Sequence, residues 1–229
     1  MMELRRNYAR SIHYWSIVAE RAFGGTIILA IFYAFLFPHM SGESGYFISI
    51  LESFPTQMMF MGTLYTVILQ LSQNGTGISL VLSFGSSRRE ALLGLQWMNI
   101  LFIVQLVVSV FLLNLVIGTH KNVLIPLMIC FSIVLLFFLA VSQIMGAFLM
   151  KKKGRSLIAI MSIVIGGMIF AMGVVLGFRS NSVRHLMTCW EETEGLWLLT
   201  AAVGILVILI YGMSVVFMRH ALRTFEVKG

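Results

Sequence analysis

Ser44 and the pair Glu191-Glu192 are the first side chains to consider for chemistry. Ser44 lies in the string Gly42-Glu43-Ser44-Gly45, which could present a serine nucleophile. A serine is a poor nucleophile without a base within hydrogen-bond reach, and the last apolar run contains no histidine. The glutamate pair lacks the arginine that would complete a protease site four residues later, because position 196 is Leu196. Neither group predicts an enzyme.

Metal and nucleotide sites are not expected in this chain. Its histidines are scattered and form no H-E-x-x-H or H-x-x-x-H pair: His13, His39, His120, His185 and His220. No G-x-x-x-x-G-K-[ST] loop is present to hold the phosphates of ATP. We therefore expect no cofactor in this chain, and any energy source must come from another one.

Uncharged polar side chains inside apolar runs are the remaining candidates. They could line a path through a membrane or hydrogen bond between helices, and they are Gln70, Gln73, Asn74, Gln105, Asn114 and Gln143. The centres of the runs contain no Asp, Glu, Lys or Arg. Carriers driven by protons or sodium usually keep a buried ionisable group, so this absence argues against such a carrier.

Six apolar runs must position these side chains. A membrane helix needs about 20 mostly apolar residues, and the runs lack the alternation of a barrel. With 59% hydrophobic and 11% charged residues, residues 1–229 are predicted to form one all-α membrane domain without a soluble part. The expected spans are about 22–37, 54–82, 93–118, 123–150, 157–178 and 196–218.

Residues 1–21 precede the first span and are predicted to form an in-plane amphipathic helix. Apolar residues recur at three- and four-residue spacing, which favours a helix in the headgroup plane with its aromatic rings at the interface: Leu4, Tyr8, Ile12, Trp15 and Ala19. The alternative is an extension of the first span into the cytosol. We expect no signal-peptide cleavage, because no small-x-small site follows the first apolar run.

The second run changes character near its end. Residues 72–77 are polar or glycine, and the full run of about 29 residues would measure about 43 Å. We therefore expect this helix to project from the membrane or to bend around Gly75 and Gly77. A charged turn follows, in which Ser86 or Ser87 can cap a helix and Glu90 has the spacing of a capping box.

Positive charge predicts the orientation. With the N-terminus in the cytosol, all but three of the 16 basic residues lie inside; the inside ones are Arg5, Arg6, Arg10, Arg21, Arg88, Arg89, Lys151, Lys152, Lys153, Arg155, Arg219, Arg223 and Lys228. Both termini are thus expected in the cytosol. The net charge of +7 is explained by contact with lipid headgroups. A nucleic-acid partner is not expected, since no inside segment is long enough for a basic module.

The string Ser-Phe-Gly-Ser-Ser-Arg-Arg-Glu between the second and third of six spans resembles the coupling segment of type-2 ABC transporter permeases. It is most similar to small exporter subunits of Gram-positive bacteria that move peptides or bacteriocins. The resemblance implies a separate ABC ATPase that binds ATP and Mg and docks on the turn, at Phe84, Gly85, Ser86, Ser87, Arg88, Arg89 and Glu90. It also implies a second permease subunit, identical or related.

Gly173-x-x-x-Gly177 on the fifth run could let a helix approach closely. Similar permeases pair through their first and fifth spans, so this motif could be a subunit contact, and packing within one subunit is equally open. The sequence thus predicts the permease of an ATP-driven exporter in a bacterial cytoplasmic membrane, with amphipathic or toxin-like peptides as cargo. The alternatives are a membrane immunity protein that captures peptides without transport and, more remotely, an intramembrane enzyme.

Overall fold

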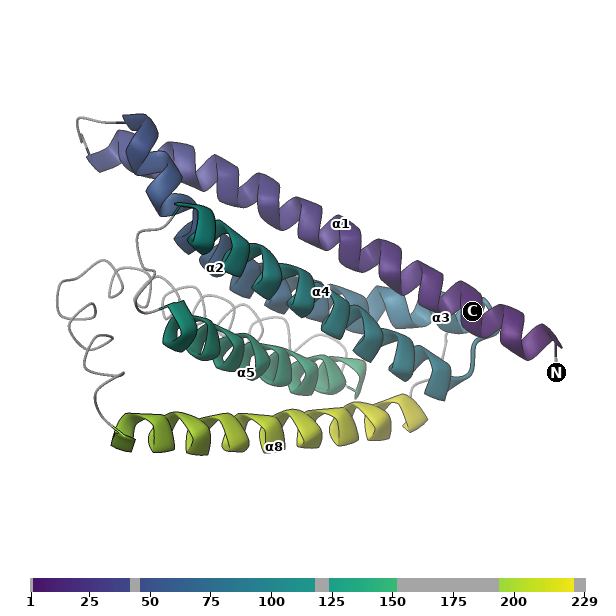
Figure 1. Cartoon of the computed structure of the whole chain (residues 1–229). Coiled ribbons are helices and arrows are strands. Elements are labelled where there is room, and N and C mark those ends of the chain that lie inside the picture. The colour runs from purple at the N-terminus through teal and green to yellow at the C-terminus, as the bar shows by residue number, and fades with distance from the viewer. Residues whose placement is uncertain (1, 42–45, 118–123, 152–193, 225–229) are drawn as a thin grey trace.

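Helices make up nearly all of the computed structural model, which describes residues 2–41, 46–117, 124–151 and 194–224 and has no strand among them. In chain order they are α1 (Met2–Ser41), α2 (Tyr46–Ser72), the π-helix η1 (Gln73–Gly77), α3 (Ile78–Ser83), α4 (Arg88–Ile117), α5 (Leu124–Lys151) and α8 (Glu194–Thr224). α1 packs on α2 and α4, α2 packs on α5, and α5 packs on α8 (Figure 1).

Several helices are long and apolar enough to cross a membrane. Within the described residues there are four: Ala9–Phe35, Arg88–Ile117, Leu124–Phe148 and Trp197–Arg223. They correspond to the expected first, third, fourth and sixth spans. The fifth expected span, 157–178, lies outside the described residues, as do Gly173 and Gly177. The chain is therefore an all-helical protein with the helices of a multi-pass membrane protein.

The expected second span, 54–82, is a continuous helix made of α2, η1 and α3. Ser72 and Gly77 keep α-helical dihedral angles at the two junctions (φ −67° and −65°). α2 is not among the four apolar helices. Several of its polar residues are buried, among them Gln57, Thr63, Thr66 and Gln70. Two of its threonines are satisfied within the helix, where Thr63 donates to the Met59 carbonyl and Thr66 to the Gly62 carbonyl. The polar residues 73–77 form a π-helical turn.

The N-terminal segment departs from the prediction. Residues 2–41 form one helix, α1, so no separate in-plane helix precedes the first span, and the alternative of a long first helix is what the structure has. Trp15, expected at the interface, is fully buried instead. Its ring lies over Gly94 of α4, where an added Cβ would be 2.2 Å from Trp15 Cδ1. The nearby Trp97 Nε1 donates to Ser16 Oγ at 3.2 Å. These contacts hold α1 against α4 well before the apolar run begins.

One end of the bundle, here called the basic end, gathers chain segments that are far apart in sequence. It comprises the start of α1, the α3–α4 turn, and the ends of α5 and α8, all on the right of Figure 1. A direct contact fixes two of them, because Arg88 Nη1 donates to the Arg223 carbonyl at 2.6 Å. The exposed cations Arg10, Arg89 and Arg219 lie on helices near this end. The opposite end contains the start of α5 and the end of α4.

Candidate functional site

The turn between α3 and α4, here called the elbow (Phe84–Arg89), is a fixed structure rather than a loose connection. The backbone N–H of Phe84 lies 3.3 Å from the carbonyls of both Leu80 and Val81, and that of Gly85 donates to Leu82 at 3.1 Å. Gly85 has φ 82°, the left-handed conformation that commonly ends a helix and that glycine adopts without strain. The backbone therefore ends α3 and reverses direction at Gly85.

The start of α4 is closed by the predicted capping box. Glu90 Oε2 accepts from the Ser87 backbone N–H at 2.8 Å, and Ser87 Oγ accepts from the Glu90 N–H at 3.2 Å. The first helical bond follows at once, from Ala91 N–H to the Ser87 carbonyl at 2.9 Å. These reciprocal bonds satisfy donors that a helix start leaves open. Of the two candidate caps, Ser87 is the one used, whereas Ser86 is buried.

The two arginines of the elbow have different roles. Arg88 donates to a carbonyl in the last turn of α8, where a cation also interacts favourably with the negative end of the helix dipole. It therefore braces the elbow against α8. Arg89 is exposed, and so is Phe84 at 49%. The elbow thus presents an aromatic ring and a cation, Phe84 and Arg89, while Arg88 holds the turn to its own chain.

A second group of polar residues lies inside the bundle. Gln143 of α5 donates to Gln96 Oε1 of α4 at 3.2 Å and accepts from Ser214 Oγ of α8 at 2.8 Å. The hydroxyl of Tyr211, also on α8, donates to the same Gln96 oxygen. Gln143 and Ser214 are fully buried. Three helices are therefore joined by an uncharged hydrogen-bond network.

Asn74 of η1 approaches this network, and Gln70 lies one turn before it in the same continuous helix. Asn74 lies against Gly146, one turn from Gln143 on α5, so closely that an added Cβ at Gly146 would be 1.7 Å from Asn74 Nδ2. Both side chains are at most 1% exposed, and their amide atoms have no hydrogen-bond partner among the described residues. We call Gln70, Asn74, Gln96, Gln143, Tyr211 and Ser214 the polar layer.

The other residues expected to line a path lie elsewhere. Gln73 accepts from the Tyr14 hydroxyl at 3.4 Å, on the side of the bundle where α1 packs. Asn114 is buried and donates to the Val110 carbonyl of its own helix at 2.8 Å. Gln105 is half-buried in α4. Of the six expected residues, the structure thus brings Asn74 to within one helical turn of Gln143, and Gln70 lies one turn before Asn74 in its own helix.

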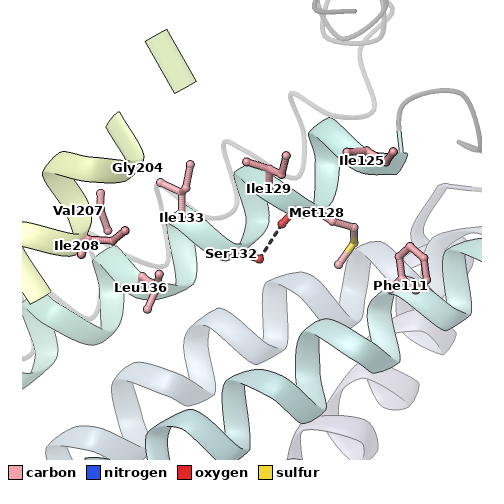
Figure 2. Close-up of a pocket in the computed structure, with 10 residues that line it drawn as sticks. All are labelled: Phe111, Ile125, Met128, Ile129, Ser132, Ile133, Leu136, Gly204, Val207 and Ile208. Carbon is pink, nitrogen blue, oxygen red and sulfur yellow. Dashed lines mark hydrogen bonds between the residues drawn. The ribbon is translucent and has the colours of Figure 1, made fainter. Parts of the chain in front are cut away.

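An apolar groove of about 380 Å³ opens between α4, α5 and α8 toward the end opposite the elbow. Figure 2 shows Val207 and Ile208 of α8 beside Ile133 and Leu136 of α5. The one hydroxyl in its lining, that of Ser132, donates to the Met128 carbonyl of the same helix at 2.8 Å. None of the six expected path residues lines it. Such a groove can accept only apolar groups.

Gln96, Tyr211 and Ser214 were missed as site residues in the sequence. Tyr211 and Ser214 stand three residues apart, which places them on one face of a helix. That spacing is a usable signal, because a hydroxyl pair on one face of a very apolar run needs partners inside the bundle. Gln96 gives a weaker signal, since it lies close to the charged end of its run.

No group of three or more His, Cys, Asp or Glu side chains that could hold a metal ion occurs in the part of the chain that the structure describes. In comparisons with protein-family models, with curated proteins and with solved structures, nothing matches this chain.

Proposed function

We propose that the chain is the membrane permease subunit of an ATP-driven ABC exporter in a bacterial cytoplasmic membrane. A separate ATPase, which carries ATP and Mg, docks at the basic end on the elbow. A second permease subunit, identical or related, completes the complex through a contact that involves the fifth span. The basic end faces the cytosol, in agreement with the charge distribution of the sequence.

The geometry of the elbow carries this proposal. Phe84 and Arg89 project from a turn that is fixed at both sides, by the Gly85 reversal and by the Ser87–Glu90 capping box. A partner that pushes on these two side chains moves α3 and α4 together, because the turn that joins the two helices is short and hydrogen-bonded at both sides. Arg88 extends this coupling to α8. A flexible charged loop would transmit no such movement.

The character of the helices favours an amphipathic peptide as cargo. The apolar groove accepts aliphatic or aromatic groups, and the polar layer offers neutral hydrogen-bonding groups. Neither surface carries a charge that would select an ion. Passive capture of peptides, as in an immunity protein, uses the same surfaces, and the two functions differ in whether an ATPase is bound.

Purification of a tagged chain from membranes of its own cells in mild detergent tests the proposal. The wild-type chain is expected to co-purify with an ATP-binding protein. The Arg89→Glu variant is expected to co-purify without it, because the charge at the docking surface is reversed. Arg219→Glu is the matched control, since it is an exposed cation of α8 outside the elbow. The proposal fails if the wild-type chain is recovered without an ATPase, or if Arg89→Glu and Arg219→Glu retain it equally. Binding of peptides by a chain without an ATPase would indicate passive capture.

A further inference from the structure

Gln70 and Tyr211 lie 13 residues from the ends of their helices at the basic end, at 83 and 224, and the other four residues of the polar layer lie at a shallower, common depth. Counted from the same ends, these four are eight to ten residues inside (Gln143 to 151, Gln96 to 88, Asn74 to 83, Ser214 to 224). At 1.5 Å per residue this depth is about 12 to 15 Å. Four separate stretches of chain thus place uncharged polar side chains at a similar level, in the half of the bundle nearer the basic end.

Part of the layer is satisfied and part is not. Hydrogen bonds link Gln96, Gln143, Tyr211 and Ser214, and Ser214 Oγ also lies 2.6 Å from the Tyr211 carbonyl, so that its one hydroxyl hydrogen is shared between this carbonyl and Gln143. Both amide atoms of Gln70 and of Asn74, and Nε2 of Gln96, are buried without a partner among the described residues. Buried polar groups are normally hydrogen bonded, and leaving them unpaired costs free energy. These side chains therefore favour any arrangement that gives them partners.

The position of the unpaired groups indicates how partners can reach them. Asn74 belongs to η1, and π-helical turns are rare and are frequently found at functional sites. The neighbour across the interface is Gly146, which has no side chain to interlock with Asn74. A small movement of η1 away from α5 therefore opens the layer without breaking a side-chain bond between Asn74 and α5.

We propose that the polar layer is a water-binding site inside the bundle, which fills when η1 moves away from α5. The unpaired atoms include amide donors and carbonyl acceptors, a combination that water satisfies with both its hydrogens and its oxygen. This property goes beyond the proposed function, since it requires neither an ATPase nor a cargo.

The test measures whether a cysteine in the layer meets water. Ser214→Cys is nearly isosteric and introduces a thiol at a fully buried position of the layer. Ala19→Cys is the matched control: Ala19 is equally buried, in the apolar core, and one turn beyond Trp15, which packs on Gly94 at a similar depth. Both variants carry Cys130→Ala and Cys189→Ala. Membrane fragments open on both sides are treated with a positively charged methanethiosulfonate reagent that does not enter lipid.

Only a hydrated thiol forms the thiolate that attacks such a reagent, since apolar burial raises the pKa of a cysteine thiol. We expect Ser214→Cys to react roughly tenfold or more faster than Ala19→Cys. Equal rates, whether fast or slow, overturn the proposal, because they show either a dry layer or a loose bundle. This result stands apart from the purification test, which concerns only the elbow.

A second variant separates hydration from local distortion by the new cysteine. Asn74→Leu keeps the approximate shape of the side chain but removes both unpaired atoms. In the Ser214→Cys background it is expected to slow labelling toward the rate of Ala19→Cys. In the native background it is expected to change the midpoint of thermal unfolding little, because the amide atoms that it removes are satisfied by water. Unchanged labelling overturns the proposal.

Discussion

Trp15 shows how a single side chain sets the course of a helix. It is fully buried near the basic end, and its indole ring fills the space that Gly94 leaves on α4. Because the contact lies in the N-terminal part of α1, it holds that part parallel to the bundle. The amphipathic stripe around Trp15 faces protein, although its composition is also typical of a helix in the headgroup plane. The burial of Trp15 against Gly94 shows that this part of α1 packs on protein and does not lie as a separate helix in the headgroup plane.

Alanine substitutions at two glycines test this contact. Gly94→Ala places a Cβ 2.2 Å from Trp15 Cδ1, a rigid ring atom, so overpacking should destabilise the fold by about 1–3 kcal/mol. Gly212→Ala is the same change in α8, where nothing lies within 4 Å of the added Cβ. It should be neutral or stabilising by up to about 1 kcal/mol. The measurement is thermal unfolding in detergent, and equal midpoints for the two variants would contradict the packing.

Arg88 connects two elements that are remote in sequence. It is the first residue of α4, yet its guanidinium donates to a carbonyl in the final turn of α8. Cations at a helix C-terminus stabilise it through its exposed carbonyls and its dipole. The brace keeps the elbow, α4 and α8 together at the basic end. Removing it should loosen the last turn of α8 and leave the rest of the bundle intact.

Arg88→Gln is expected to speed amide hydrogen exchange in residues 221–224 roughly two- to fivefold, the range given by a lost cation at a helix end. Arg89→Gln, the adjacent change, is the control and should leave exchange in α8 unchanged. Hydrogen exchange followed by mass spectrometry of C-terminal peptides makes the comparison. If both variants accelerate exchange equally, general charge rather than the Arg88 contact would account for the effect.

The sequence predicts elements better than their contacts. Apolar runs gave the described spans to within a few residues, apart from the longer ends of α1 and α8, because lipid demands a minimum apolar length. The Ser87–Glu90 capping box was also predictable, since it depends on residues three apart. Three features were not predictable: the length of α1, the contact of Arg88 with α8, and the place of Gln96 in the polar layer. Each depends on a partner more than 45 positions away, which local spacing does not reveal.

Over the whole molecule, charged, uncharged polar and apolar side chains gather at different levels along the bundle. The basic end carries the elbow and exposed arginines, the half of the bundle next to it carries the uncharged polar layer, and the opposite half carries the apolar groove. This order suits a protein that is driven from one end and handles an amphipathic cargo along its length. α8 meets the rest of the bundle mainly through α5, and most of its apolar residues are exposed, as expected for a surface that meets lipid.

Photocrosslinking from the elbow in intact membranes tests the proposed docking most directly. Phe84 is replaced by p-benzoylphenylalanine, a larger aromatic residue that the exposed position can hold and that reacts with its neighbours under ultraviolet light. Phe217, an exposed aromatic residue of α8, receives the same substitution as a control for lipid contact. We predict that position 84 crosslinks to a protein that also binds an azido-ATP label, and that position 217 does not. Crosslinks from position 84 to lipid alone, or to a protein without nucleotide binding, would contradict the account.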